Sequence, residues 1–264
     1  MVTLLHQSSA ALYLAATLAT ALGLALPDAR LARLSVWTLA GAALLHAVAF
    51  AGLHSLDPPP ALTTLPAAVS LMAWLAVLFT LVLLRRGRLE SLAGLTAPFA
   101  FAASLYAAAT LAGAAPPEPA GAGRWPHLHV ILASAGLSLL GVAGVAGVLF
   151  LAENRQLKAK RAGSLRRPLP SLEALDRVNV VALALGFPLL TSGVIAGMIW
   201  SEALTGRAWD GGAHATWTGI AWAIYLGLVL ARFALGWRGR DAAACAAAGF
   251  AFLLFAVIGV ESIL

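Results

Sequence analysis

The chain has 264 residues, of which 61% are hydrophobic and 11% are charged, and its mean hydropathy is +0.89. Soluble domains carry about a quarter charged residues, so this composition excludes an ordinary soluble domain and indicates a membrane protein. The formal net charge is +6, but the positions of the charges, described below, indicate membrane topology rather than nucleic-acid binding. The single cysteine, Cys245, excludes an internal disulfide, a CxxC redox pair and a CxxCH motif.

Eight apolar runs are long enough to cross a membrane as helices, which takes roughly 20 residues each. They cover about 3–25, 34–54, 62–84, 92–114, 128–152, 178–200, 214–236 and 242–263. We interpret the first run as a retained span rather than a cleaved signal peptide. No fixed-period repeat interrupts the pattern. The sequence therefore predicts an all-α, polytopic membrane helix bundle of eight transmembrane helices in a single domain, residues 1–264.

The basic residues predict the orientation of these spans. Of the 17 Lys and Arg residues, all but Arg124 and Arg207 lie on connections of one parity. Basic connections stay in the cytoplasm, so we expect both termini to face outward, together with a tryptophan-rich segment at about 200–225. In a bacterium this describes a multi-pass protein of the inner (plasma) membrane whose functional face is periplasmic. The basic inner connection, Glu153–Arg177, either sets this topology or docks a cytoplasmic partner.

Glycine patterns predict close helix packing within the chain. Small residues let helices approach one another in lipid, and they recur in two of the apolar runs: Gly141, Gly144 and Gly147 in one, and Gly193 and Gly197 in the next. Pro188 lies in the second of these apolar runs and predicts a kink there. Proline-rich connections at Leu56–Ala61 and Ala115–His127 are expected to cover the outer face.

The sequence offers little to a catalytic mechanism. It has no HExxH motif, no phosphate-binding glycine loop and no serine elbow, and Glu261 is the one acidic residue well inside an apolar run. We therefore expect binding and transfer rather than catalysis. The polar residues that remain are six histidines, all predicted on the outer side of the membrane: His6, His46, His54, His127, His129 and His214.

Two of these histidines are candidate ligands of a haem iron. His129 and His214 each begin an apolar run that enters from the outer side, so their imidazoles can project at similar depth. Nearby aromatic residues can cover a flat, apolar macrocycle. The alternative is that each imidazole caps its helix or lies among lipid headgroups. Zinc fits less well, because it prefers a compact tetrahedral ligand set. His46 lies deeper, and either binds haem or is neutral and hydrogen-bonded to a neighbouring helix.

Five stretches in order resemble the cytochrome c assembly family of haem-handling membrane proteins, and in particular its short HemX-like branch. They are LLHAVAFAGLH with SLMAW, HVILASAGLSLL with LAENRQLK, LPSLEALDRVNVVALALGFPLLTSGVIAG, HATWTGIAWAIY, and GWRGRDA. The family's WGxYWxWDPKETW pattern is reduced here to RAWDGGAHATW, and we do not expect this chain to carry the large outer domain of the haem-attaching members.

The resemblance implies a set of site residues and partners. It makes His129 and His214 the outer haem ligands and His46 the intramembrane histidine. The haem-platform segment would be represented by Trp209, Asp210, Trp217 and Trp222. The cofactor would be non-covalent haem b, and the partners would be membrane lipid and other cytochrome c maturation proteins or an apocytochrome, with no nucleic acid.

Two other functions stay open on the residues alone. The chain could be a non-enzymatic membrane partner or regulator, of a transporter or a cytoplasmic protein, that keeps the scaffold without stable haem. A metal or small-solute transporter is less favoured, because intramembrane carboxylates are scarce.

Overall fold

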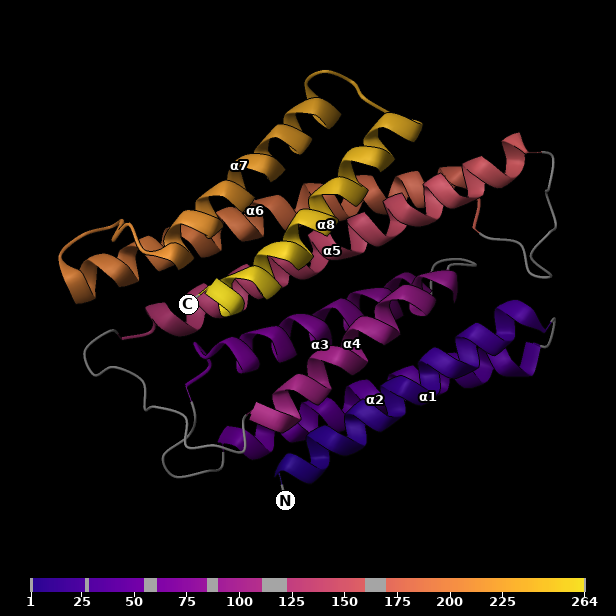
Figure 1. Cartoon of the computed structure of the whole chain (residues 1–264), viewed down its shortest axis with the longest axis horizontal. Helices are drawn as coiled ribbons and strands as arrows, with labels where there is room; N and C mark the ends of the chain where they lie inside the picture. Colours follow the sequence, from indigo (N-terminus) through magenta and orange to yellow (C-terminus); the bar gives the residue numbers. More distant parts are fainter. Residues whose placement is uncertain are drawn as a thin grey trace. The chain divides into compact units, whose positions relative to one another are not determined.

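The computed structural model describes residues 2–26, 29–54, 61–84, 90–110, 123–159 and 170–263 (Figure 1). Every regular element in these ranges is an α-helix, as the apolar runs predicted. The helices are α1 (Val2–Ala25), α2 (Ala29–His54), α3 (Leu65–Leu84), α4 (Glu90–Thr110), α5 (Trp125–Lys158), α6 (Leu172–Thr205), α7 (Ala213–Phe233) and α8 (Gly239–Ile263). Three of the connections discussed above lie partly outside the described residues. The undescribed parts are 56–60 of Leu56–Ala61, most of Ala115–His127, and the centre of Glu153–Arg177.

Six of the helices, α2 to α7, are long and apolar enough to cross a membrane within the ranges the structure describes. The chain is thus all-helical and multi-pass. In α1, His6, Gln7 and two serines occupy the first turns and lower its hydropathy. The number of eight crossings and the outward position of both termini stay predictions.

The helices fall into two compact units. The first comprises Met1–Glu118 with Gln156–Pro170, and the second comprises Pro119–Arg155 with Ser171–Leu264. Helices α1 to α4 lie in the first unit, while α6 to α8 and most of α5 lie in the second. The prediction of a single domain over 1–264 is not tested by this division.

Glycines bring α5 against its neighbours in the second unit. A Cβ added at Gly193 of α6 would lie 2.6 Å from the backbone nitrogen of Ala133 in α5. On another face of α5, a Cβ added at Gly147 would lie 2.6 Å from the carbonyl oxygen of Ala243 in α8. Larger side chains would force these helices apart, so the predicted role of the glycines in intramolecular packing is confirmed at these positions.

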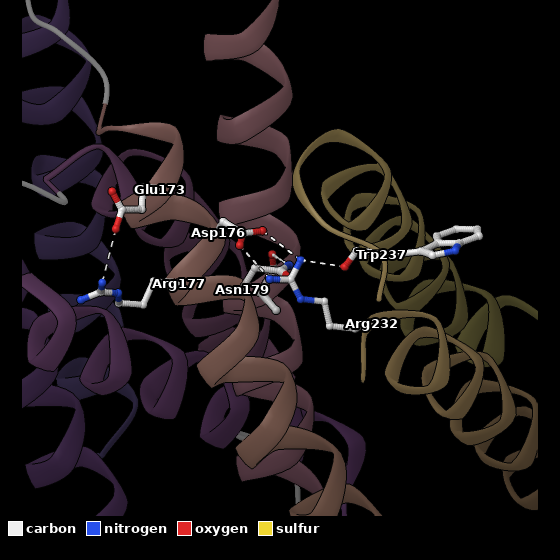
Figure 2. A network of polar contacts seen from close by, with 7 residues as sticks. Glu173, Asp176, Arg177, Asn179, Arg232 and Trp237 are labelled. Carbon is white, nitrogen blue, oxygen red and sulfur yellow. Dashed lines mark hydrogen bonds and ion pairs between the residues drawn. The ribbon is translucent and has the colours of Figure 1, made fainter. Parts of the chain in front are cut away.

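An ion pair ties α6 to α7 near the start of α6 and the end of α7 (Figure 2). Arg232 Nη1 and Nη2 donate to the two carboxylate oxygens of Asp176 at 3.0 and 2.7 Å, and Nη1 also donates to the carbonyl oxygen of Trp237 at 3.0 Å. One turn along α6, Asn179 Nδ2 donates to the carbonyl oxygen of Ala143 in α5. A bidentate, mostly buried pair of this kind fixes the relative position of the elements that carry it.

Candidate functional site: a histidine pair beside a tryptophan-lined pocket

Two histidine rings lie together near the starts of α5 and α7. In α7 this is the end opposite to the one that carries Arg232. The centroids of the His129 and His214 imidazoles lie 6.3 Å apart, and the ring planes meet at 79°. The two rings line a cavity of about 200 Å³ together with the last turns of α6 and the loop that follows it. Among its lining residues are Trp200, Trp209 and Asp210. All of these residues belong to the second unit.

The loop between α6 and α7 is built by local hydrogen bonds. Gly206 ends α6 in the left-handed conformation (φ +71°), and its N–H donates to the carbonyl oxygen of Glu202, as is usual where a helix is terminated by glycine. Ser201 Oγ then donates to the carbonyl oxygen of Arg207 at 2.9 Å. Asp210 Oδ1 accepts from the Gly212 N–H at 2.9 Å, forming a side-chain turn. Helix α7 begins at the next residue, so His214 falls in its first turn.

The hydrogen bond of His129 assigns a role to each of its ring nitrogens. Its Nδ1 lies 2.8 Å from the carbonyl oxygen of Gly193 in α6. A carbonyl oxygen can only accept a hydrogen bond, so Nδ1 is the donor, and the tautomer that carries its proton there has its lone pair on Nε2. Histidines that bind metals in proteins are commonly held in this way, with one ring nitrogen donating to a carbonyl and the other facing the metal. The bond thus leaves His129 ready to act as a ligand through Nε2.

Gly197 makes the approach of His129 to α6 possible. A Cβ added at Gly197 would lie 2.6 Å from His129 Nδ1 and 2.9 Å from Cε1. Because Gly193 and Gly197 are one helical turn apart and both lack side chains, the backbone carbonyl of Gly193 is accessible on the helix surface. The glycine pair therefore serves both helix packing and the orientation of one imidazole.

Two tryptophans form the aromatic wall of the pocket. The Trp200 ring lies 6.0 Å from the His129 ring, centroid to centroid, and its Nε1 is buried without a hydrogen-bond partner among the described residues. The Trp209 ring lies against α7, where a Cβ added at Gly219 would be 2.7 Å from Trp209 Cη2. Trp209 is 46% exposed, so one side of this indole faces outward while the other covers the start of α7.

The other two predicted tryptophans lie away from the pocket. Trp217 packs against Phe252 and Phe255 of α8, at centroid distances of 6.1 and 6.0 Å. Trp222 lies deeper along α7, where its Nε1 donates to Thr191 Oγ1 at 3.0 Å. Of the predicted site residues, the structure therefore brings together His129, His214, Trp209 and Asp210.

His46 occupies a different environment in the first unit. It is fully buried on α2, and both of its ring nitrogens have partners: Nε2 lies 2.8 Å from Ser70 Oγ, and Nδ1 lies 3.3 Å from the Tyr13 hydroxyl. The ring stacks on Phe50 at 5.0 Å, and the ring of His6 lies 5.5 Å away. These contacts correspond to the alternative of a neutral histidine hydrogen-bonded to neighbouring helices.

The sequence did not single out Trp200 or Gly197 as residues of the pocket. Trp200 begins the tryptophan-rich segment predicted at about 200–225 but was not a predicted site residue, and Gly197 was predicted only to pack helices. A signal for both was present, since Gly193, Gly197 and Trp200 recur at spacings of four and three and so fall on one side of a helix.

The family profile and the similar proteins found by comparison all point to one family. The profile described as "Cytochrome C assembly protein" matches residues 62–264. The chain is 26% identical, over 72% of its length and 73% of the relative, to "Cytochrome c biogenesis protein CcsA" of Gloeothece citriformis. It is 29% identical to the CcsA of Thermosynechococcus vestitus, over 63% of this chain and 64% of the relative. It is 35% identical to the CcsA of Gloeobacter violaceus, over 47% of this chain and 36% of the relative.

Proposed function

The chain belongs to the cytochrome c assembly protein family, and we propose that it binds haem non-covalently between His129 and His214 and passes it on. In this proposal the histidine pair lies at the outer face of a bacterial inner membrane, with eight crossings and both termini outward. The matched relatives are named as cytochrome c biogenesis proteins, which supports a role in cytochrome c assembly. The protein would bind and transfer its ligand without making or breaking covalent bonds.

The distance between the two imidazoles is the observation that carries the proposal. A metal–imidazole bond is about 2 Å long. The ring centre lies about 1 Å beyond the bonded nitrogen, so two imidazoles that bind one metal ion have centroids no more than about 6 Å apart. The His129 and His214 centroids are 6.3 Å apart, so both residues would hold the iron of one haem.

The donor set favours haem iron over a bare metal ion. Among the residues that the structure describes, no group of three or more His, Cys, Asp or Glu side chains is close enough to hold a metal ion. A structural zinc ion needs four protein ligands. Haem, when bound, supplies an iron that already has four macrocycle nitrogens and takes only two further ligands. Two histidines are enough for such a ligand.

The remaining residues of the pocket position and shield the pair. The Gly193 carbonyl holds the ring of His129 in one orientation, and the indoles of Trp200 and Trp209 give the cavity beside it an aromatic lining. The cavity of about 200 Å³ is smaller than the roughly 300–1,000 Å³ of pockets that enclose most of a small molecule. Partial enclosure suits a protein that hands its ligand to an apocytochrome or to another maturation protein.

The test is an optical spectrum of the detergent-purified protein, with and without added haem. We expect a Soret band in the wild type, and a weaker or shifted band in His129→Ala and in His214→Ala. His127→Ala is the matched control. His127 lies two residues before His129 on α5 but does not line the cavity. A colourless wild-type protein that takes up no added haem would contradict the proposal and favour a scaffold that acts on a membrane partner without haem.

A further inference from the structure

The two histidines of the pocket differ in how their rings are held. His129 Nδ1 donates to the carbonyl oxygen of Gly193, whereas the His214 ring makes no hydrogen bond with the residues that the structure describes. A histidine that binds a metal almost always donates its other ring N–H to a carboxylate, a backbone carbonyl or a water. The second ligand of the proposed site therefore needs an acceptor beside it.

Asp210 provides an acceptor close to His214. It is the one Asp, Glu, Lys or Arg residue among those that line the cavity, and it lies four residues before His214. Gly212 stands between them and directly precedes α7. The Asp210 carboxylate lies against this glycine, since a Cβ added at Gly212 would be 3.3 Å from Oδ1 and 3.6 Å from Oδ2. The carboxylate and the imidazole are therefore both located where α7 begins.

The two carboxylate oxygens of Asp210 are used differently. Oδ1 accepts from the Gly212 N–H at 2.9 Å, which fixes the side chain next to the first turn of α7. Oδ2 accepts no hydrogen bond from the part of the chain that the structure describes. Because an ionised carboxylate accepts at both of its oxygens, Oδ2 keeps the capacity to bind an imidazole N–H.

We propose that Asp210 is a positioning residue for haem ligation, whose Oδ2 accepts the N–H of the His214 imidazole while the other ring nitrogen binds the iron. This inference rests on the proposed function, in which His214 is a ligand. A charged acceptor makes a hydrogen bond about twice as strong as a neutral one. The role also explains the sign of the charge, because an acidic side chain would otherwise only disfavour a ligand that carries carboxylates itself.

The pairing has an electrostatic consequence for the iron. A carboxylate that accepts from a ligating imidazole raises the basicity of the ligating nitrogen. The more basic ligand stabilises the higher positive charge of Fe(III) more than that of Fe(II), and second-shell hydrogen bonds are one of the means by which a protein sets the potential of haem. Asp210 therefore lowers the reduction potential of the bound haem, an effect that a purely structural residue does not have.

The experiment is a redox titration of the haem-loaded, detergent-purified protein, with Asp210→Asn as the informative variant. The amide oxygen of Asn can still accept from the Gly212 N–H, so the turn before α7 is kept. The charge is lost, and an NH₂ group that can only donate replaces Oδ2. We expect Asp210→Asn to weaken the binding of ferric haem about tenfold more than that of ferrous haem, which raises the midpoint potential by about 59 mV for one electron.

Two further variants complete the experiment. Asp210→Glu keeps the charge, so we expect its midpoint potential to lie closer to that of the wild type than the potential of Asp210→Asn does. Thr218→Val removes the other free acceptor, a hydroxyl that lines the cavity one turn after His214 and makes no hydrogen bond with the described residues. We expect Thr218→Val to leave the potential unchanged.

Two results would overturn the inference and leave the proposed function standing. One is an Asp210→Asn protein with the midpoint potential of the wild type, as expected if Asp210 only builds the turn. The other is a rise in potential in Thr218→Val and none in Asp210→Asn, which would assign the acceptor to Thr218. A wild type that takes up no haem would overturn the proposed function as well.

Discussion

The backbone of Gly197 lies so close to the His129 imidazole that an added Cβ would be 2.6 Å from Nδ1. The ring is also held by the Gly193 carbonyl at 2.8 Å. A single methyl group at this position therefore cannot be accommodated without moving the ring and breaking its hydrogen bond.

We accordingly predict that Gly197→Ala weakens haem binding by about tenfold or more, the range seen when the group that orients a metal-binding histidine is lost. The measurement is an absorbance titration of the purified protein. Gly227→Ala is the control, since a Cβ added at Gly227 meets nothing within 4 Å. Equal affinities in the two variants would show that the His129–Gly193 bond does not matter for the ligand.

The ion pair between Arg232 and Asp176 should contribute strongly to stability. The Arg232 and Asp176 side chains are 8% and 28% exposed, so removing one partner leaves a mostly buried charge. We predict that Arg232→Gln lowers the free energy of unfolding by about 2–4 kcal/mol, somewhat less than the cost for a fully buried pair. The measurement is unfolding by SDS titration from a mild detergent.

Figure 2 provides the control for this experiment in the same view. Arg177 and Glu173 form an ion pair at 3.4 Å whose side chains are 76% and 85% exposed. Exposed pairs contribute about 1 kcal/mol at most, so Arg177→Gln should be close to the wild type. A loss of equal size in both variants would refute the distinction between the two pairs.

The contacts of His46 predict a structural role that can be separated from haem binding. Tyr13→Phe removes one hydroxyl next to Nδ1, and we expect it to lower the free energy of unfolding by about 1 kcal/mol. His46→Gln should cost more, because it changes a fully buried side chain that Ser70 and Tyr13 both contact. The amplitude and position of the Soret band should not change in either variant. Loss of that band in His46→Gln, with the fold intact, would instead support the haem ligation that the family resemblance implied.

Trp209 and Gly219 should be coupled energetically. The close contact of 2.7 Å between an added Cβ and Trp209 Cη2 means that Gly219→Ala displaces the indole from α7. We predict that haem dissociates several-fold faster from Gly219→Ala. In a Trp209→Ala background the same change should have no further effect, because residues in contact give non-additive changes. Additive effects of the two substitutions would place the influence of Gly219 elsewhere.

The sequence predicted the number and order of the helices well, and their ends less well. Helices α5 and α6 each have 34 residues, longer than the apolar runs at about 128–152 and 178–200. The helix of α5 continues into ENRQLK, and that of α6 begins before its apolar run with LEALDR. Polar residues with good helix propensity extend a helix beyond the bilayer, and a count of apolar residues does not detect this.

The pairing of the two histidines was predictable, but the environment of each tryptophan was not. His129 and His214 both begin helices that enter from the same side, and the structure places their rings together. Trp222 is eight residues after His214, which is about 12 Å further along a helix, so its depth could have been deduced. The direction of Trp217 depends on the position of α8, and its contacts with Phe252 and Phe255 are tertiary features that periodicity does not encode.

The anchoring of the segment after α6 has a consequence for how a ligand would come and go. The carbonyl of Arg207 accepts from Ser201, and Asp210 fixes the Gly212 amide, so the backbone here is poorly suited to swing aside as a flap. The half-exposed indole of Trp209, by contrast, can leave its contact with α7 by a change of rotamer about two side-chain bonds. We expect exchange of the ligand to follow the rotamer changes of this single residue, and its rate to depend on them rather than on local unfolding of the chain.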